Sequence, residues 1–154
     1  MRIVWFRHWQ LDVDPQATRQ AYAAISQGPG EPCGCETCRN FAAARDQLYP
    51  PHISAFLDQL GINREHEIEL YHLARLPSGL HEYGGWFHAV GQIITGPDAH
   101  QQISATSFWL DLERVTEHLA MGCSASIALA PAAFATRPLI QAEVPWLINQ
   151  PEPD

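Results

Sequence analysis

The sequence contains no lysine: all nine of its positive charges are arginines, against seventeen acidic residues, and the net charge is −8. The arginines are scattered along the chain, whereas nucleic-acid binding requires a clustered basic face. We therefore expect no nucleic-acid partner and no attachment to an anionic membrane surface. The absence of lysine also excludes Schiff-base chemistry and a P-loop. The lysine-free, Arg- and Ala-rich composition is typical of a GC-rich bacterial genome.

Long apolar runs are also missing, because no stretch approaches the roughly 20 residues that span a bilayer. The N-terminal segment 1–8 carries arginine, histidine and tryptophan within its apolar run, which does not fit a signal peptide. We therefore expect a cytoplasmic location. The motifs G-x-S-x-G, G-x-G-x-x-G and H-E-x-x-H are absent as well, so an enzymatic function would depend on cysteines and histidines alone.

Cysteine is scarce, but three of the four cysteines lie between positions 33 and 38, in the stretch C-G-C-E-T-C-R-N-F. A C-x-C-x-x-C run has three interpretations: metal binding, thiol redox chemistry, or burial of small apolar side chains. Clustering in a reducing cytosol favours metal, and tetrahedral Zn²⁺ is the leading candidate. An iron–sulfur cluster would need a fourth sulfur. If the thiols oxidise instead, Cys35 and Cys38 should pair, because C-x-C closes too small a ring.

The predicted zinc ligands are three cysteines and one histidine: Cys33, Cys35, Cys38 and His88. His81 is an alternative fourth ligand, because it and His88 flank the flexible pair Gly84-Gly85. Cys123 is the other alternative: it offers sulfur, but its apolar strand alternation predicts simple burial. The remaining histidines of interest, His72, His100 and His118, are expected to have no special role.

Hydrophobic periodicity indicates helices early in the chain and strands late. Alternation predicts one strand over residues 3–13. Asp14-Pro15 then starts a helix, a second helix follows the cysteines, and a third runs from Pro51 to Leu60, with Gly61 beyond its end. Five further strands are predicted: 66–72, 81–94, 107–112, 123–129 and 138–144. A short helix is predicted over 114–121.

This order predicts an α+β fold, with an N-terminal strand, two to three helices and a mainly antiparallel sheet of about four to five strands. Residues 1–148 should form a single domain and 149–154 a frayed tail. The third helix should pack on the sheet through Ile53, Phe56, Leu57 and Leu60, which follow helical spacing.

The stretches C-G-C-E-T-C-R-N-F, H-E-Y-G-G-W-F-H-A-V-G and V-P-W-L resemble a family of uncharacterised bacterial proteins. The resemblance covers most of the chain and implies a small soluble bacterial domain, without an activity. Two functional classes remain open. One is a binding or regulatory module with a structural zinc site, which meets a protein partner or forms a homo-oligomer. The other is a zinc- or thiol-dependent enzyme that uses the region of His81 and His88.

Overall fold

The computed structural model describes residues 1–25, 36–134, 137–144 and 146–149, and for 36–38, 42, 46 and 146–149 it describes the backbone alone. Within these ranges the helices are α1 Pro15–Ala23, α2 Glu36–Ala44, η1 Arg45–Gln47, α3 Pro51–Leu60 and η2 Ala132–Phe134, where η marks a 3₁₀ helix. The strands are β1 Arg2–Phe6, β2 Trp9–Val13, β3 Glu69–Arg75, β4 Leu80–Thr95, β5 His100–Gln102, β6 Phe108–Leu110, β7 Glu113–Thr116, β8 Leu119–Ser124, β9 Leu139–Glu143 and β10 Trp146–Asn149.

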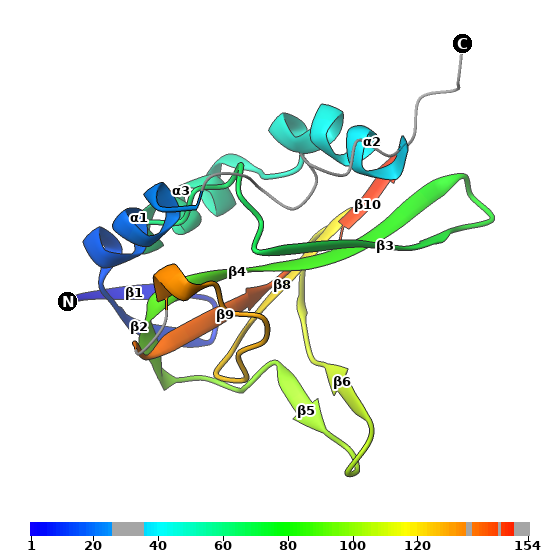
Figure 1. The fold of residues 1–154 in the computed structure, drawn as a ribbon. Coiled ribbons are helices and arrows are strands. Elements are labelled where there is room, and N and C mark those ends of the chain that lie inside the picture. Colours follow the sequence, from blue (N-terminus) through cyan, green and yellow to red (C-terminus); the bar gives the residue numbers. More distant parts are fainter. Residues whose placement is uncertain (26–35, 135–136, 145, 150–154) are drawn as a thin grey trace.

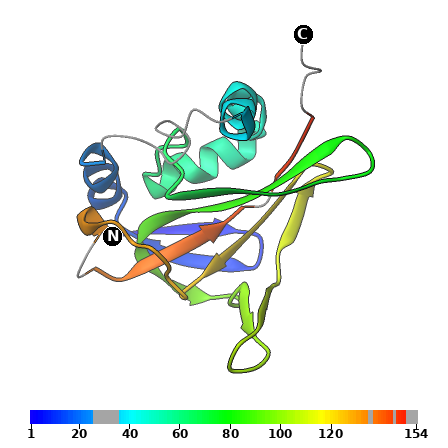
Figure 2. The ribbon, with the colours of Figure 1, turned by 45° about the vertical axis from the view of Figure 1, so that its right-hand side comes forward.

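Eight of the described strands form one antiparallel sheet in the order β1-β2-β4-β10-β8-β7, with β3 paired to β4, and β9 paired to both β4 and β8. Helices α1, α2 and α3 lie on one face of this sheet, which we call the helix-covered face (Figure 1). Strands β5 and β6 form a separate hairpin that projects away from the helices (Figure 2). The α+β class and the leading strand are thus confirmed, although the sheet has more strands than expected.

The sixteen-residue strand β4 is the central strand of the sheet, because β2, β3, β9 and β10 all pair with it. Between the part of β4 that pairs with β3 and the part that pairs with β2, side chains of helix α1 form the hydrogen bonds to the β4 backbone. The Tyr22 hydroxyl accepts from the His88 amide at 3.0 Å and donates to the His88 carbonyl at 2.9 Å. The Val90 amide donates to the Thr18 hydroxyl at 2.9 Å. These bonds fix α1 to β4, because unpaired buried backbone groups are costly.

The predicted start of α1 and both predicted ends of α3 are confirmed, whereas α1 ends at Ala23, earlier than its spacing predicts. The Asp14 carboxylate caps α1 by accepting from the Ala17 amide at 3.0 Å, and Pro15 is the first helical residue. Helix α3 begins at Pro51 and ends at Gly61, whose φ of 82° is a left-handed conformation that favours glycine. A side chain at Gly61 would also overlap the Pro15 carbonyl oxygen, so this glycine lets the two helices approach.

The hydrophobic core lies between the helices and the sheet. Helix α3 buries the four residues predicted from its spacing, Ile53, Phe56, Leu57 and Leu60. The rings of Phe56 and Phe6 stack with centroids 4.4 Å apart, which joins α3 to β1. Further along, the rings of Tyr49 and Phe87 have centroids 6.2 Å apart, which joins the turn before α3 to β4.

The single strand predicted over 3–13 is two strands, β1 and β2, joined by a tight turn. Arg7 takes a φ of 51° in that turn. Phe6 and Trp9 are cross-strand partners, so both side chains lie on the same buried face. A single strand would instead place residues 6 and 9 on opposite faces, which is why the alternation was misleading. No glycine or proline marks the turn, so the usual sequence signals were missing.

The helix predicted over 114–121 is wrong, because this segment forms β7, a turn and the start of β8. Val115 and Thr116 are β-branched and favour strand geometry. The His118 amide donates to the Thr116 side-chain oxygen at 3.1 Å, which stabilises the turn between the two strands. A further strand, β10, follows position 145, where the last strand had been predicted to end.

Candidate functional site

The cysteine cluster lies at the limit of what the structure describes. Cys33 and Cys35 fall outside the described residues, and so does the side chain of Cys38, whose backbone belongs to α2. The three-thiolate site therefore stays a prediction. Among the described residues, no group of three His, Cys, Asp or Glu side chains comes close enough together to hold a metal ion.

Helix α2 is attached to the helix-covered face through Tyr83 of β4. The Asn40 side-chain amide donates to the Tyr83 hydroxyl at 3.2 Å, and the ring centroids of Phe41 and Tyr83 lie 5.4 Å apart. Just after the helix, Arg45 forms two hydrogen bonds of 3.0 and 2.9 Å to the buried Glu67 carboxylate. Burial raises the pKa of Glu67, whereas the Arg45 guanidinium lowers it. Separating a buried ion pair is costly, so this pair holds the end of α2 in place.

Two histidines meet beside Tyr83 on the helix-covered face. His72 of β3 and His81 of β4 lie with Nε2 of His72 2.9 Å from Nδ1 of His81. His81 is buried and His72 is exposed, with its ring edge-on to Tyr83 at a centroid distance of 5.1 Å. One nitrogen of the pair must donate and the other accept, so each ring orients the other. A metal-ligating histidine is usually held in this way, through its second nitrogen.

His88, the predicted fourth ligand, is fully buried and bonded to other groups. Its Nε2 lies 2.9 Å from Gln141 Oε1, an oxygen that also accepts from the Ala128 amide at 2.8 Å. An amide oxygen can only accept, so His88 carries its hydrogen on Nε2, and burial lowers its pKa. The Gln141 amide in turn donates to Glu143 Oε1 at 2.6 Å. His88 Nδ1 has no hydrogen-bond partner within the described part of the chain.

The two predicted histidines lie on opposite faces of β4, because side chains alternate along a strand. His81 shares its parity with Tyr83, which contacts α2, whereas His88 has the other parity. The rise of a strand separates them by roughly 23 Å along β4. One ion cannot bind both histidines, and the two do not line one pocket.

Cys123, the sulfur alternative, is fully buried as predicted, near the end of β8, whereas residues 125–129 of the strand predicted over 123–129 are exposed and not part of a strand. It pairs with Ala142, which pairs with Phe87, so its side chain faces the helix-covered side. Burial, with a smaller effect of the Asp98 charge, raises the pKa of the Cys123 thiol to about 12. Such a thiol is unreactive, and strand spacing puts it roughly 20 Å from His81.

On the face of the sheet opposite the helix-covered face, Trp86 and its cross-strand neighbours form a row of side chains that runs across the strands. Trp86 pairs with Glu69 of β3 on one side and with Glu143 of β9 on the other, and Glu143 pairs with Gly122 of β8. Tyr71 lies beside this row, with its ring 6.2 Å from that of Trp86. The sequence signalled none of this, because the row exists only once the strands pair.

We call the five residues Glu69, Tyr71, Glu82, Trp86 and Glu143 the open face. Burial raises the pKa of Tyr71, and the charges of Glu143, Glu69 and Glu82 raise it further. The three carboxylates therefore act on one aromatic side chain.

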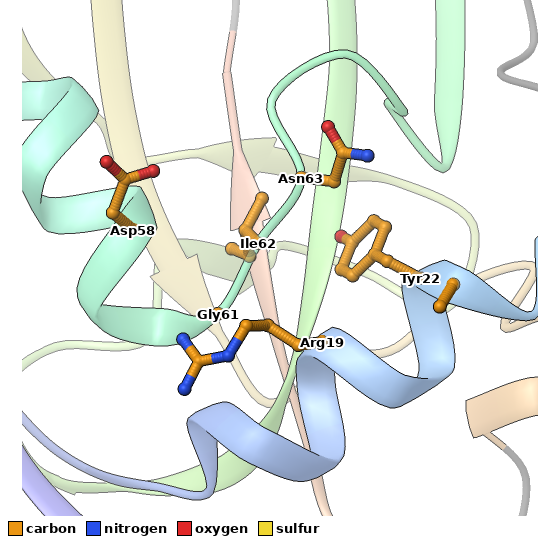
Figure 3. A pocket seen from close by; sticks show the side chains of 7 residues that line it. Arg19, Tyr22, Asp58, Gly61, Ile62 and Asn63 are labelled. Atoms are coloured by element: carbon orange, nitrogen blue, oxygen red, sulfur yellow. The ribbon is translucent and has the colours of Figure 1, made fainter.

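A pocket of about 440 Å³ opens where α1 approaches the end of α3 (Figure 3). Its lining includes Arg19, Tyr22, Asp58 and Asn63, and no histidine or cysteine is among its described lining residues. The Tyr22 hydroxyl is bonded to the backbone of His88, and burial raises its pKa. The pocket therefore offers polar groups for binding.

Comparisons with family models, with curated proteins and with solved structures find no match. None of the described helices has the length and apolar content that a membrane span requires. Functional inference therefore depends on the geometry of the two faces of the sheet.

Proposed function

We propose that this protein is a protein-binding module in which one zinc ion joins the cysteine segment to the sheet. The ligands would be Cys33, Cys35, Cys38 and His81. The observation that carries the proposal is the His72–His81 pair, on the face and the strand to which α2 is attached. Three thiolates and one imidazole form a closed tetrahedral set of the kind that structural zinc sites use.

The position of α2 supports His81 as the imidazole ligand. Phe41 contacts Tyr83, which is two positions from His81 on the same side of β4. Residues three apart in a helix share a face, and Cys38 is three residues before Phe41. The expected position of Cys38 is thus toward the part of the sheet that carries His81, and away from His88 and Cys123.

His72 would act as a positioning residue for the metal ligand. If His81 bound the ion through Nε2, its Nδ1–H would donate to His72 Nε2 across the observed 2.9 Å. Such outer partners fix the tautomer and orientation of a metal-ligating histidine, and their loss typically weakens metal binding about 10–100-fold. The zinc would supply structure here, because a full ligand set leaves no position for water or substrate.

A binding function is supported by the surface rather than by the pockets. Large apolar side chains are exposed on the outer face of β1 and on the β5–β6 hairpin, namely Ile3, Trp5, Ile103, Phe108 and Trp109. Monomeric proteins seldom expose several large aromatic residues without a binding role. The net charge of −8 favours a basic protein partner over nucleic acid.

Metal analysis of variants tests the proposal. We expect one zinc per chain in the wild type, loss of zinc in Cys35→Ser and in His81→Ala, and weaker zinc binding in His72→Ala. His72→Gln should restore part of the affinity, because its amide oxygen can accept the same hydrogen bond. His118→Ala removes an exposed histidine and is the matched control. Zinc retained in His81→Ala but lost in His88→Gln would reject the proposed ligand set.

A further inference from the structure

The open face presents an aromatic ring between two carboxylates. Glu69 and Glu143 are the direct cross-strand neighbours of Trp86 in an antiparallel sheet. Directly opposed residues have Cβ atoms about 4.5–5.5 Å apart. Trp86 is partly exposed, and two residues before it the Tyr71 ring lies against Gly84, in the space that a side chain there would occupy. Helices α1, α2 and α3 all lie on the other side of the sheet (Figures 1 and 2), and on this side the short helix η2 packs at His88 through Phe134.

The β5–β6 hairpin forms a wall beside this row. Ala99 and Leu112, at the base of the hairpin, lie against Gly122, which is the neighbour of Glu143. His100 stacks on Phe108 with ring centroids 4.4 Å apart, and its charge favours the ionised form of Glu143. Phe108 itself is exposed. The carboxylates and Trp86 of the row therefore lie next to the aromatic side chains of the hairpin.

The described part of the chain pairs no arginine with these carboxylates, and the positive charge that acts on Glu143 is that of His100. The described ion pairs to arginine use Glu113, Glu67 and Asp58, and none reaches Glu69, Glu82 or Glu143. Glu143 is only 6% exposed, yet the hydrogen bond described for it comes from the neutral amide of Gln141. A buried carboxylate without a directly paired cation is costly. The Trp86 indole N–H is also buried without an acceptor among the described residues.

We propose that the open face binds a basic partner protein, with an arginine of the partner seated on Trp86 between Glu69 and Glu143. A guanidinium stacks on a tryptophan ring and forms directed hydrogen bonds to carboxylates, which an ammonium group does less well. The lysine-free chain with its net charge of −8 attracts such a partner over a long range. This inference rests on the proposed binding function and names its surface and its partner's chemistry.

The test uses the full chain and a defined probe, acetyl-hexaarginine amide, with acetyl-hexalysine amide for comparison. Binding is followed at low salt by the NMR signal of the Trp86 indole N–H, assigned by its absence in Trp86→Phe. The double variant Glu69→Gln/Glu143→Gln is compared with Asp58→Asn/Glu65→Gln. Asp58 and Glu65 are exposed and lie outside the open face, and both double variants change the net charge equally, from −8 to −6.

We expect the arginine peptide to shift the Trp86 signal and to bind more tightly than the lysine peptide. The open-face double variant should bind about tenfold more weakly, and the control less than twofold. Equal losses in the two double variants would mean diffuse attraction and would overturn the inference. So would an unshifted Trp86 signal, or self-association of the chain through this face in sedimentation. If the double variant unfolds, Trp86→Phe decides, with an expected loss of about two- to fivefold.

Zinc content is measured in the same samples, so that the two proposals can fail separately. Zinc-loaded protein that does not bind the arginine peptide would reject the open-face inference alone. Protein that binds the peptide and contains no zinc would reject the proposed metal site alone.

Discussion

Strand β4 has two faces that differ in chemistry, although the same sixteen residues make both. On the helix-covered side, Tyr83 and Phe87 are fully buried against aromatic side chains from the helical region. On the other side, Glu82 and Trp86 are partly exposed and surrounded by carboxylates. The comparison teaches that one strand can stabilise the fold on one side and, on the other, present the surface for which we propose a recognition role.

The side of β4 that carries Trp86 is only partly open, because the 125–134 segment covers the part of it around His88. His88 follows Trp86 on that side, but it is sealed by Phe134, at a ring centroid distance of 5.8 Å, and by the hydrogen bond to Gln141. The Gln141 oxygen thus satisfies the Nε2–H of the buried His88 ring, as buried polar groups require. The open face therefore begins where the cover of the 125–134 segment ends.

The largest expected effect comes from the helix-covered side. Phe87→Ala should cost about 3–5 kcal/mol of unfolding free energy, because it leaves a cavity in a close-packed core. Trp86→Ala, one position away on β4, should cost only about 1–2 kcal/mol, because the ring is already partly in water. Urea unfolding of the two variants measures the difference. Equal costs would contradict the division into a structural and a recognition side.

A second prediction concerns the link between α1 and β4. Tyr22→Phe removes the hydroxyl that bonds both backbone groups of His88, and should cost about 1–3 kcal/mol because those groups stay buried. Tyr71→Phe removes a hydroxyl for which no hydrogen bond is described, on a residue that is 37% exposed, and should change stability by about 0.5 kcal/mol or less. Thermal unfolding of the pair checks this. A smaller loss in Tyr22→Phe than in Tyr71→Phe would reject the assigned role of α1.

The smallest effect depends on pH and concerns Glu143. Burial, the largest cause, raises its pKa, while the Gln141 hydrogen bond and the His100 charge lower it. The wild type should therefore lose stability as pH rises from the usual value for glutamate, about 4.3, through the raised value in the folded state. Glu143→Gln cannot ionise and should be the more stable protein at neutral pH.

The advantage of Glu143→Gln should disappear as the pH falls below the ordinary range for glutamate, because both proteins are then uncharged at this position. Urea unfolding between pH 4 and pH 8 measures the difference. A variant that is less stable than the wild type at pH 7 would show that the Glu143 charge is favourable in the folded protein.

Local signals predicted the helices better than the strands. The Asp14 cap, Pro51 and Gly61 act on neighbouring backbone groups, so α1 and α3 could be placed from the sequence. The β1–β2 turn could not, because Arg7 adopts its left-handed conformation without a glycine. The β7–β8 segment was misjudged because charged and apolar residues alternate there at a spacing that also fits a helix.

The candidate sites depend on strand register, which the sequence does not state. His72 seemed unremarkable until pairing brought it to His81, beside a bulge between His72 and Ala74. Gln141 and Glu143 became relevant only as the cross-strand neighbours of His88 and Trp86. Burial of Cys123 was predicted correctly, although the strand predicted over 123–129 ends at Ser124 and residues 125–130 are exposed.

The central claim is that thiolates of the cysteine segment and the His81 imidazole bind one zinc ion. X-ray absorption at the zinc edge on the purified full chain tests it most directly. We predict three sulfur neighbours at about 2.3 Å and one nitrogen neighbour at about 2.0–2.1 Å, with the nitrogen lost in His81→Ala. A shell of four sulfurs, a nitrogen that survives in His81→Ala, or protein that binds no zinc would contradict the claim.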